Sequence, residues 1–226
     1  MQSKDQKNTK PESLEFFGSI TASVTHELMN VIAIINELTG LLDDMRYSVE
    51  QGQTIESDRL ESLHERLARQ VNRAEKIIKR LNRFAHSADH ELTTFDLNEV
   101  LLNLVGIMQR LADMKKIQLI YEPSQSELGC TGNPFELQHL IFRCARMLFN
   151  TAEEGATVSL AAQKQGESYD LNIKCSSIEG AGPDENDLEL VTELAEIYGW
   201  KMVQKREESK FSFILTIPIV QIKDGG

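Results

Sequence analysis

The fold of this chain is decided by residues 13–45, which read SLEFFGSITASVTHELMNVIAIINELTGLLDDM. The segment contains no proline, and its apolar residues are separated alternately by three and four positions. This is the a/d spacing of helices that pack along a common seam. The residues of the series are Phe17, Val24, Leu28, Val31, Ile35, Leu38, Leu42 and Met45, with Thr21 in the same line.

The same spacing returns after residues 47–57, which contain Gly52 and interrupt the pattern. The second series consists of Leu60, Leu63, Leu67, Ala74, Ile77, Leu81 and Phe84. Two helices of about 30 residues would each be about 45 Å long at 1.5 Å per residue. The sequence therefore predicts a disordered polar tail over residues 1–11 and an antiparallel helical hairpin over residues 12–90.

A two-helix hairpin cannot bury an apolar line on both of its helices by itself. We therefore expect two copies to form a homodimer through a four-helix bundle. The alternative is that the C-terminal half of the same chain covers the line.

The alternating spacing of apolar residues does not continue beyond residues 86–96, which we interpret as a linker. Asp96 and Asn133 are helix start signals, and Gly199 is a stop signal. The predicted helices cover residues 97–115, 134–155 and 185–198, and the predicted strands cover 117–122, 157–163, 169–175, 200–205 and 211–219. This order indicates an α/β sandwich over residues 94–222, with helices on one side of a mixed sheet, and an α+β fold class for the chain.

Composition excludes several function classes. The 226 residues carry a formal net charge of −11, which argues against a protein that binds nucleic acid. We expect no membrane segment, because no continuous apolar run is long enough to cross a bilayer. Three scattered cysteines, Cys130, Cys144 and Cys175, match neither a disulfide framework nor a metal site, so we expect a cytoplasmic protein without bound metal.

The candidate site is the run His26-Glu27-Leu28-Met29-Asn30. With Val24 and Leu28 on the seam, His26 and Asn30 fall on the outer face of the helix, one turn apart. A neutral imidazole is a competent nucleophile toward phosphorus. Glu27 could hold the ring tautomer and Asn30 could donate to a phosphoryl oxygen. The other interpretation is a solvent-exposed histidine without a function.

The stretch SITASVTHELMNVIAIINELTGLL resembles the H-box helix of two-component sensor histidine kinases. The residues that match the family pattern H-E-[IL]-x-[NT]-P-L are His26, Glu27, Leu28 and Asn30. Val31 stands where the family usually has proline, which implies a straighter helix because proline would kink it. In that family a dimeric hairpin presents the phosphorylated histidine.

The C-terminal half is similar to the kinase ATP-binding domain, but the nucleotide motifs are absent. The two asparagines of the N-box fall at about Arg143 and Met147, and a hard cation such as Mg²⁺ prefers oxygen ligands to either side chain. The segment that should contain Asp-x-Gly-x-Gly reads Ser176-Ser177-Ile178-Glu179-Gly180. The resemblance therefore implies a degenerate ATPase fold, and we expect no nucleotide cofactor.

A degenerate kinase fold that keeps its H-box resembles the dimeric histidine phosphotransferases of bacterial phosphorelays. This implies an enzyme in which His26 takes a phosphoryl group from the aspartate of one response-regulator receiver domain and passes it to another. The expected partners are receiver domains, which bring their own Mg²⁺, and, as a second candidate, a hybrid histidine kinase. The alternatives are an inactive pseudokinase adaptor and a receiver aspartyl-phosphate phosphatase in which Asn30 orients water.

Overall fold

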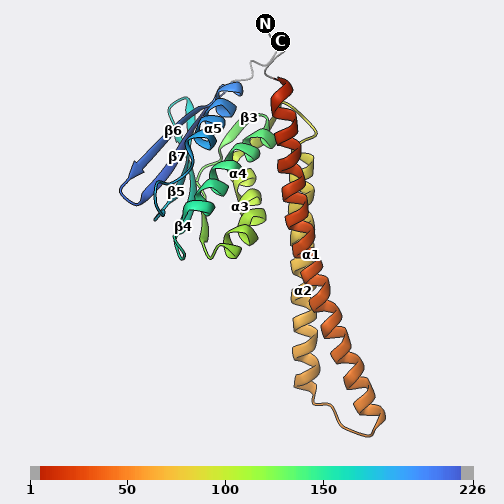
Figure 1. Cartoon of the computed structure of the whole chain (residues 1–226). Helices are drawn as coiled ribbons and strands as arrows, with labels where there is room; N and C mark the ends of the chain where they lie inside the picture. The colour runs from red at the N-terminus through yellow and green to blue at the C-terminus, as the bar shows by residue number, and fades with distance from the viewer. Residues whose placement is uncertain (1–5, 220–226) are drawn as a thin grey trace, which may run out of the picture. The chain divides into compact units, whose positions relative to one another are not determined.

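A computed structural model of the chain describes residues 6–219, and the side chains from Glu12 onward. The chain divides into two compact units (Figure 1). Residues 17–82 form one, which we call the hairpin unit, and the described residues up to Phe16 together with those from Arg83 form the other, which we call the α/β unit.

The hairpin unit consists of most of α1 (Gln6–Glu50) and α2 (Ser57–His86). The loop between them contains Gly52, whose φ of 83° is in the left-handed region that ends helices. The Gly52 N–H donates to the Val49 carbonyl at 2.9 Å and closes the last turn of α1. The antiparallel hairpin predicted from the sequence is thus confirmed within one chain.

The predicted tail is in part wrong, because α1 begins at Gln6 and continues through Pro11. Pro11 is the sixth residue of the helix, where it removes the one hydrogen bond that its own N–H would have donated to the Lys7 carbonyl, and the helix continues past it. Residues 1–5 of that prediction lie outside the described residues.

The core of the hairpin follows a seven-residue repeat on both helices. On α1 the buried residues of the repeat are Val24, Val31, Leu38 and Met45, and on α2 they are Leu63, Ile77 and Phe84. Leu38, Met45 and Leu63 form a cluster against which Ile34, Leu41, Ile55 and Leu67 pack. A single chain therefore buries only one half of the predicted α1 series, and Leu28, Ile35 and Leu42 remain partly or largely exposed.

Helix α1 also contains a stretch, within residues 12–50, that is long and apolar enough to cross a membrane by length and composition alone. The prediction from the sequence was based on continuous apolar runs, whereas in this stretch of α1 uncharged polar residues separate the apolar ones. A core helix of a soluble protein meets the same test, so this finding by itself does not identify a membrane span.

The α/β unit has a five-stranded mixed sheet in the order β2-β4-β5-β7-β6. Its strands are β2 (Gln118–Glu122), β4 (Thr157–Gln165), β5 (Ser168–Cys175), β6 (Lys201–Glu207) and β7 (Lys210–Pro218). Strand β2 is parallel to β4, and the remaining neighbours are antiparallel. The mixed sheet is as predicted.

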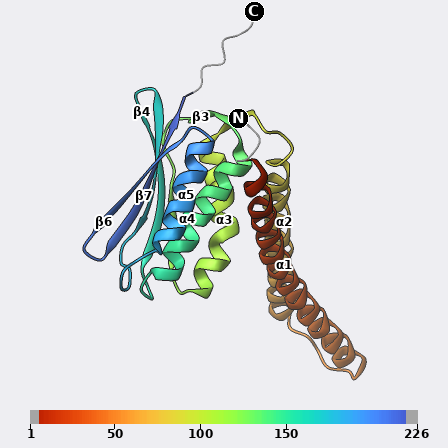
Figure 2. The ribbon, with the colours of Figure 1, turned by 45° about the horizontal axis from the view of Figure 1, so that its top comes forward.

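Three helices cover one face of this sheet: α3 (Leu97–Met114), α4 (Pro134–Thr151) and α5 (Glu185–Ile197) (Figure 2). The strands alternate, so that in β7 every second residue from Phe211 to Ile217 is buried against the helices. The predicted caps are present: Asp96 accepts from the Asn98 N–H, and Asn133 accepts from the N–H groups of Phe135 and Glu136.

Two predicted boundaries differ from the structure. The expected linker contains β1 (Thr93–Asp96), which pairs with β3 (Gly129–Gly132) in a small antiparallel sheet. Helix α4 ends at Thr151 and not near Gly155, because Ala152 is already extended and bridges to Ile178. Both depend on partners distant in sequence, which a local pattern does not contain.

Candidate functional site

His26 and Asn30 lie on the exposed surface of α1, as the sequence predicted. At 100° per residue, Glu27, Asn30 and His26 lie about 60°, 120° and 160° from the buried Val24 on one side of the helix. Leu28 lies about 40° from Val24 on the other side. The motif therefore places three polar side chains in succession from the edge of the seam to the outer surface.

Glu27 occupies the position nearest the seam and pairs with α2. Its Oε1 accepts from Arg73 Nη2 at 3.1 Å, and the exposed fractions of the side chains are 20% for Glu27 and 53% for Arg73. The carboxylate that we predicted as a partner for the imidazole is thus engaged by a guanidinium of the opposite helix. Glu27 and His26 leave the helix about 100° apart, which separates their side chains.

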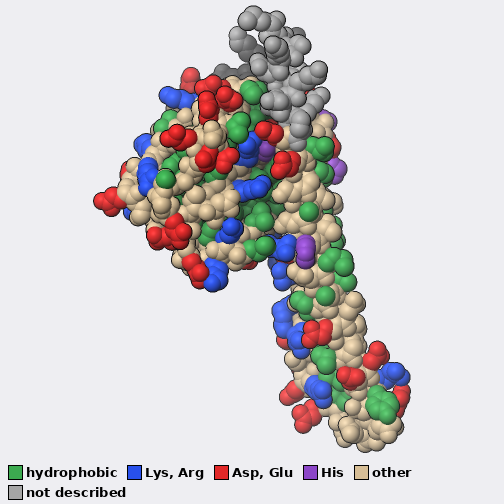
Figure 3. Space-filling model, viewed as in Figure 1, with side chains coloured by type: hydrophobic (Ala, Val, Ile, Leu, Met, Phe, Trp, Pro, Cys, Tyr) green, Lys and Arg blue, Asp and Glu red, His purple; other side chains and the backbone are tan. Residues whose placement is uncertain are grey.

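The Glu27–Arg73 contact identifies which sides of the two helices adjoin. On α2, Arg66, Arg73 and Arg80 repeat every seven residues along one side of the buried line. We call the side of the hairpin formed by these arginines with His26, Glu27 and Asn30 the acceptor face. Figure 3 shows Lys and Arg side chains along one edge of the hairpin.

The opposite side of the hairpin is apolar. Its exposed residues are Ile32 and Leu42 on α1 and Leu60, Val71 and Ile78 on α2, and Leu28 and Ile35 are partly exposed between them. We call this set the apolar face. The hairpin thus separates a polar, basic side that contains the candidate nucleophile from a side rich in unpartnered aliphatic groups.

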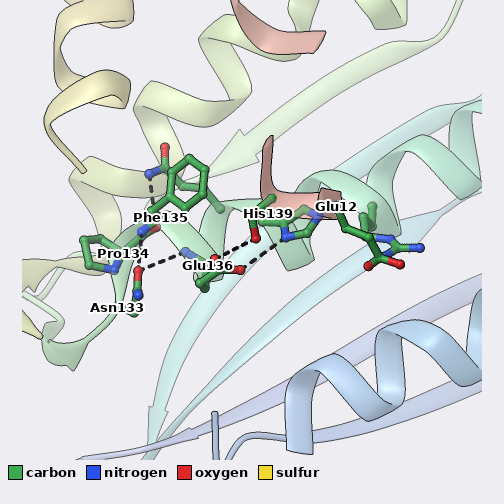
Figure 4. Close-up of polar contacts among 9 residues, drawn as sticks. Glu12, Asn133, Pro134, Phe135, Glu136 and His139 are labelled. Atoms are coloured by element: carbon green, nitrogen blue, oxygen red, sulfur yellow. Dashed lines mark hydrogen bonds and ion pairs between the residues drawn. The ribbon is translucent and has the colours of Figure 1, made fainter. Parts of the chain in front are cut away.

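In the α/β unit, residues 12–16 of α1 are anchored to α4 (Figure 4). Ser13 Oγ donates to Glu136 Oε1 at 2.8 Å, and His139 Nδ1 lies 3.2 Å from Glu136 Oε2. The Phe16 ring stacks on the His139 ring with centroids 5.0 Å apart. This cluster was not predicted from the sequence, although the i,i+3 spacing of Glu136 and His139 on one helix face is a local signal for their contact.

The positions that should contain the N-box asparagines are occupied differently. Arg143 Nη1 donates to Glu12 Oε2 at 2.5 Å, so the guanidinium is neutralised by the start of α1. Met147 is buried. Neither residue offers the oxygen ligands that a magnesium nucleotide requires.

The connection from β5 to α5 is the segment where the resemblance to sensor histidine kinases places an adenine motif and a lid. It is short, and hydrogen bonds attach it to other parts of the α/β unit. The N–H groups of Ile178 and Glu179 donate to the carbonyls of Ser209 and Thr151, each at 2.7 Å. The Arg206 guanidinium donates to the carbonyls of Gly180 and Ala181. Ile178 is buried, so this segment folds back onto the unit as part of its core.

No metal centre competes with this interpretation of the site. Among residues 6–219, no group of three or more His, Cys, Asp or Glu side chains is arranged to hold a metal ion. His86 Nδ1 lies 2.8 Å from the Asp89 carboxylate.

Comparisons with known proteins find similarity to histidine kinases. No protein-family model matches the chain. The sensor histidine kinase ZraS of Salmonella typhimurium is 20% identical over 176 residues, which are 78% of this chain and 36% of that protein. The chain therefore spans about a third of the curated relative that it matches.

Solved structures agree on the fold. A histidine kinase from Burkholderia phymatum STM815 matches with a TM-score of 0.50 and 15% identity, over 89% of this chain and 98% of that one. Histidine kinase ThkA, solved in complex with the response regulator protein TrrA, matches with a TM-score of 0.50 and 15% identity, over 96% of this chain and 66% of that one. The chain thus has the fold of a histidine kinase, with a helical hairpin and an α+β domain that resembles the kinase ATPase domain.

Proposed function

We propose that this chain is a histidine phosphotransferase of a two-component phosphorelay, with His26 as the phosphoacceptor. The observation that carries the proposal is the exposed His26–Asn30 pair on the acceptor face of a helical hairpin with the fold of histidine kinases. A rigid helix that presents an imidazole to a docking protein is suited to phosphoryl transfer, which depends mainly on positioning and charge stabilisation.

The reaction is an exchange between two phosphorylated side chains. A ring nitrogen of His26 attacks the phosphorus of a receiver aspartyl phosphate, the new N–P bond forms, and the O–P bond to the aspartyl carboxylate breaks. The second transfer reverses this step with another receiver. The Mg²⁺ that offsets the phosphoryl charge comes with the receiver, so this chain needs no metal of its own.

Two features of the α/β unit support transfer without ATP. Arg143 and Met147 replace the expected oxygen ligands, and the turn around Ile178 fills the place of an adenine motif and lid. The phosphoryl group must then come from another protein. ThkA provides an example of a related fold in complex with a response regulator, and we propose receiver domains as the partners of this chain in the cytoplasm.

We propose a second copy of this chain as the occupant of the apolar face. Exposed Leu, Ile and Val side chains on both helices continue the seven-residue repeat of the hairpin, which is the pattern of a four-helix bundle. Dimerisation on this side leaves the acceptor face open to receivers.

The decisive experiment incubates the protein with phosphorylated receivers and follows the acid-labile label on the chain. We expect label on the wild-type protein and none on His26→Ala, which should fold normally because alanine is well tolerated at an exposed helical position. Met29→Ala, an exposed change three residues along the same helix, is the matched control and should accept label. Label on His26→Ala at the wild-type rate would refute the proposal.

Asn30 favours one alternative activity, because an amide beside the histidine could orient water toward a receiver aspartyl phosphate. The variant Asn30→Ala separates the two activities. If the chain is a transferase, label still reaches His26 in this variant at a modestly changed rate. If it is a phosphatase, receiver dephosphorylation is lost in Asn30→Ala and persists in part in His26→Ala.

A further inference from the structure

The ion pair between Glu27 and Arg73 joins the two helices beside the candidate phosphoacceptor, and the proposed function does not by itself involve this pair. It connects residues 46 positions apart in the sequence, with Arg73 Nη2 and Glu27 Oε1 separated by 3.1 Å. Its arginine is the more exposed partner. The pair lies on the acceptor face, on the same side of α1 as His26 and Asn30.

Arg73 is held by a single contact that a stronger anion could displace. Ion pairs between partly exposed side chains contribute little to stability, so the guanidinium can leave Glu27 easily. Guanidinium binds phosphate through two parallel N–H···O bonds, and a phosphoryl group carries more negative charge than a carboxylate. A phosphoryl group on His26, which precedes Glu27 on the same side of α1, would therefore compete with the Glu27 carboxylate for Arg73.

We propose that Arg73, together with Asn30, forms a phosphoryl-binding subsite that is filled when His26 is phosphorylated. This inference rests on the proposed function and extends it. In the resting protein Glu27 holds Arg73 beside the site. After phosphorylation the guanidinium turns from the carboxylate to the phosphoryl oxygens, and the Asn30 amide donates to the same group from the next turn of α1.

The other basic residues of α2 are placed differently. Arg69 Nη1 lies 3.4 Å from Glu65, and Lys79 Nζ lies 2.6 Å from Glu75, both on their own helix. Near Arg73 on α2, Arg69 and Lys76 are further exposed basic residues, one turn before it and one turn after it. Arg73 is the member of this set that reaches α1 in the structure.

Arg66 provides a matched control. It occupies the equivalent place one repeat before Arg73, about 10 Å along the helix, and is likewise exposed. Arg66→Gln and Arg73→Gln remove the same charge from the same side of α2, but only the second removes the proposed subsite.

The experiment uses potassium phosphoramidate as the phosphoryl donor, so that no receiver is needed. The imidazole attacks phosphorus, an N–P bond forms, and ammonia leaves. The phosphohistidine signal of His26, identified as the one that is absent from His26→Ala, is then titrated by ³¹P NMR in the wild type and in Arg73→Gln, Arg73→Lys and Arg66→Gln. A nearby cation favours the more ionised form of the phosphoryl group. The titration midpoint of phosphohistidine should therefore rise by about 0.5 pH unit in Arg73→Gln, which lacks this cation. The titration midpoint should stay near the wild-type value in Arg66→Gln. In Arg73→Lys it should lie closer to the wild-type value than in Arg73→Gln, because lysine keeps the positive charge.

The outcomes separate the inference from the proposed function. If the wild type accepts no acid-labile phosphoryl group at His26 from phosphoramidate or from receivers, the proposed function fails. If the wild type is phosphorylated and Arg73→Gln has the wild-type midpoint, the subsite is refuted while the phosphoacceptor stands. Equal shifts in Arg66→Gln and Arg73→Gln would also overturn the subsite, because they would show a general effect of charge on α2.

Discussion

Cys144 lies on α4 with its thiol fully buried, and this burial raises the pKa of the thiol well above its usual range. Burial also raises the pKa of Cys130 to about 11. At Tyr121, burial and then the nearby Asp96 carboxylate raise the pKa to about 12. These groups are kept neutral by the packing of the α/β unit, so each one links folding to pH.

We expect the protein to lose stability as the pH rises above about 8.5, where thiols of the unfolded chain begin to ionise. A group whose pKa is raised by folding stabilises the folded state below its unfolded pKa, and this contribution is lost as the pH increases. The urea midpoint, measured with reducing agent, should fall between pH 8 and pH 10.5. Cys144→Ala should show a shallower fall, and an unchanged midpoint in the wild type would contradict the prediction.

The apolar residues of the hairpin fall into two groups, one buried between α1 and α2 and one exposed on the apolar face. Leu38 is completely buried between α1 and α2, whereas Ile78 is 45% exposed on the apolar face. The first position belongs to the core of one hairpin, and the second is available to another copy. Substitutions at the two positions should therefore have different consequences.

We expect Ile78→Glu to give a folded monomer, because a charge in the proposed interface would be buried without a partner. Asn72→Glu, an exposed change on the opposite side of α2, should remain dimeric. Analytical ultracentrifugation measures the outcome. A wild-type monomer at micromolar concentration, or a dimeric Ile78→Glu, would refute the interface.

Leu38→Ala tests the hairpin core itself. Removing a fully buried leucine typically costs about 2–5 kcal/mol of unfolding free energy, so the urea midpoint should fall strongly. The same change at the half-exposed Leu42 should cost much less in a monomeric Ile78→Glu background. Similar losses at both positions would show that α1 does not face α2 through Leu38.

At the scale of the whole molecule, the chain combines a helical hairpin, for which we propose a phosphoacceptor role, with an α/β unit in which two arginines make contacts within the unit. Arg143 pairs with Glu12, and Arg206 secures the carbonyls of Gly180 and Ala181. These contacts hold the unit together.

We expect no saturable binding of ATP or ADP with Mg²⁺ in isothermal titration calorimetry up to millimolar concentration. The double change Arg143→Asn and Met147→Asn should not restore binding, because the connection around Ile178 would still fill the region. A micromolar dissociation constant for the wild type would contradict this interpretation of the α/β unit.

Much of this architecture was predictable because its signals are local. The seven-residue repeat identified both hairpin helices, and Asp96, Asn133 and the alternation in β7 identified the caps and the sheet. The exposure of His26 and Asn30 followed from their spacing relative to Val24. The short strands β1 and β3 were missed because each has only four residues and needs the other.

The sequence by itself determined the helices, the strands of the five-stranded sheet, the polar motif on α1 and the absence of the family's nucleotide motifs, because these depend on the order and spacing of neighbouring residues. Only the tertiary structure decided which half of the apolar repeat is buried within one chain and which half is left exposed. It also decided that Glu27 faces Arg73, since the register of two antiparallel helices sets which residues 46 positions apart can meet. The physical reason is that helix periodicity fixes where a side chain lies around its own helix, while the packing of a second helix chooses its partner.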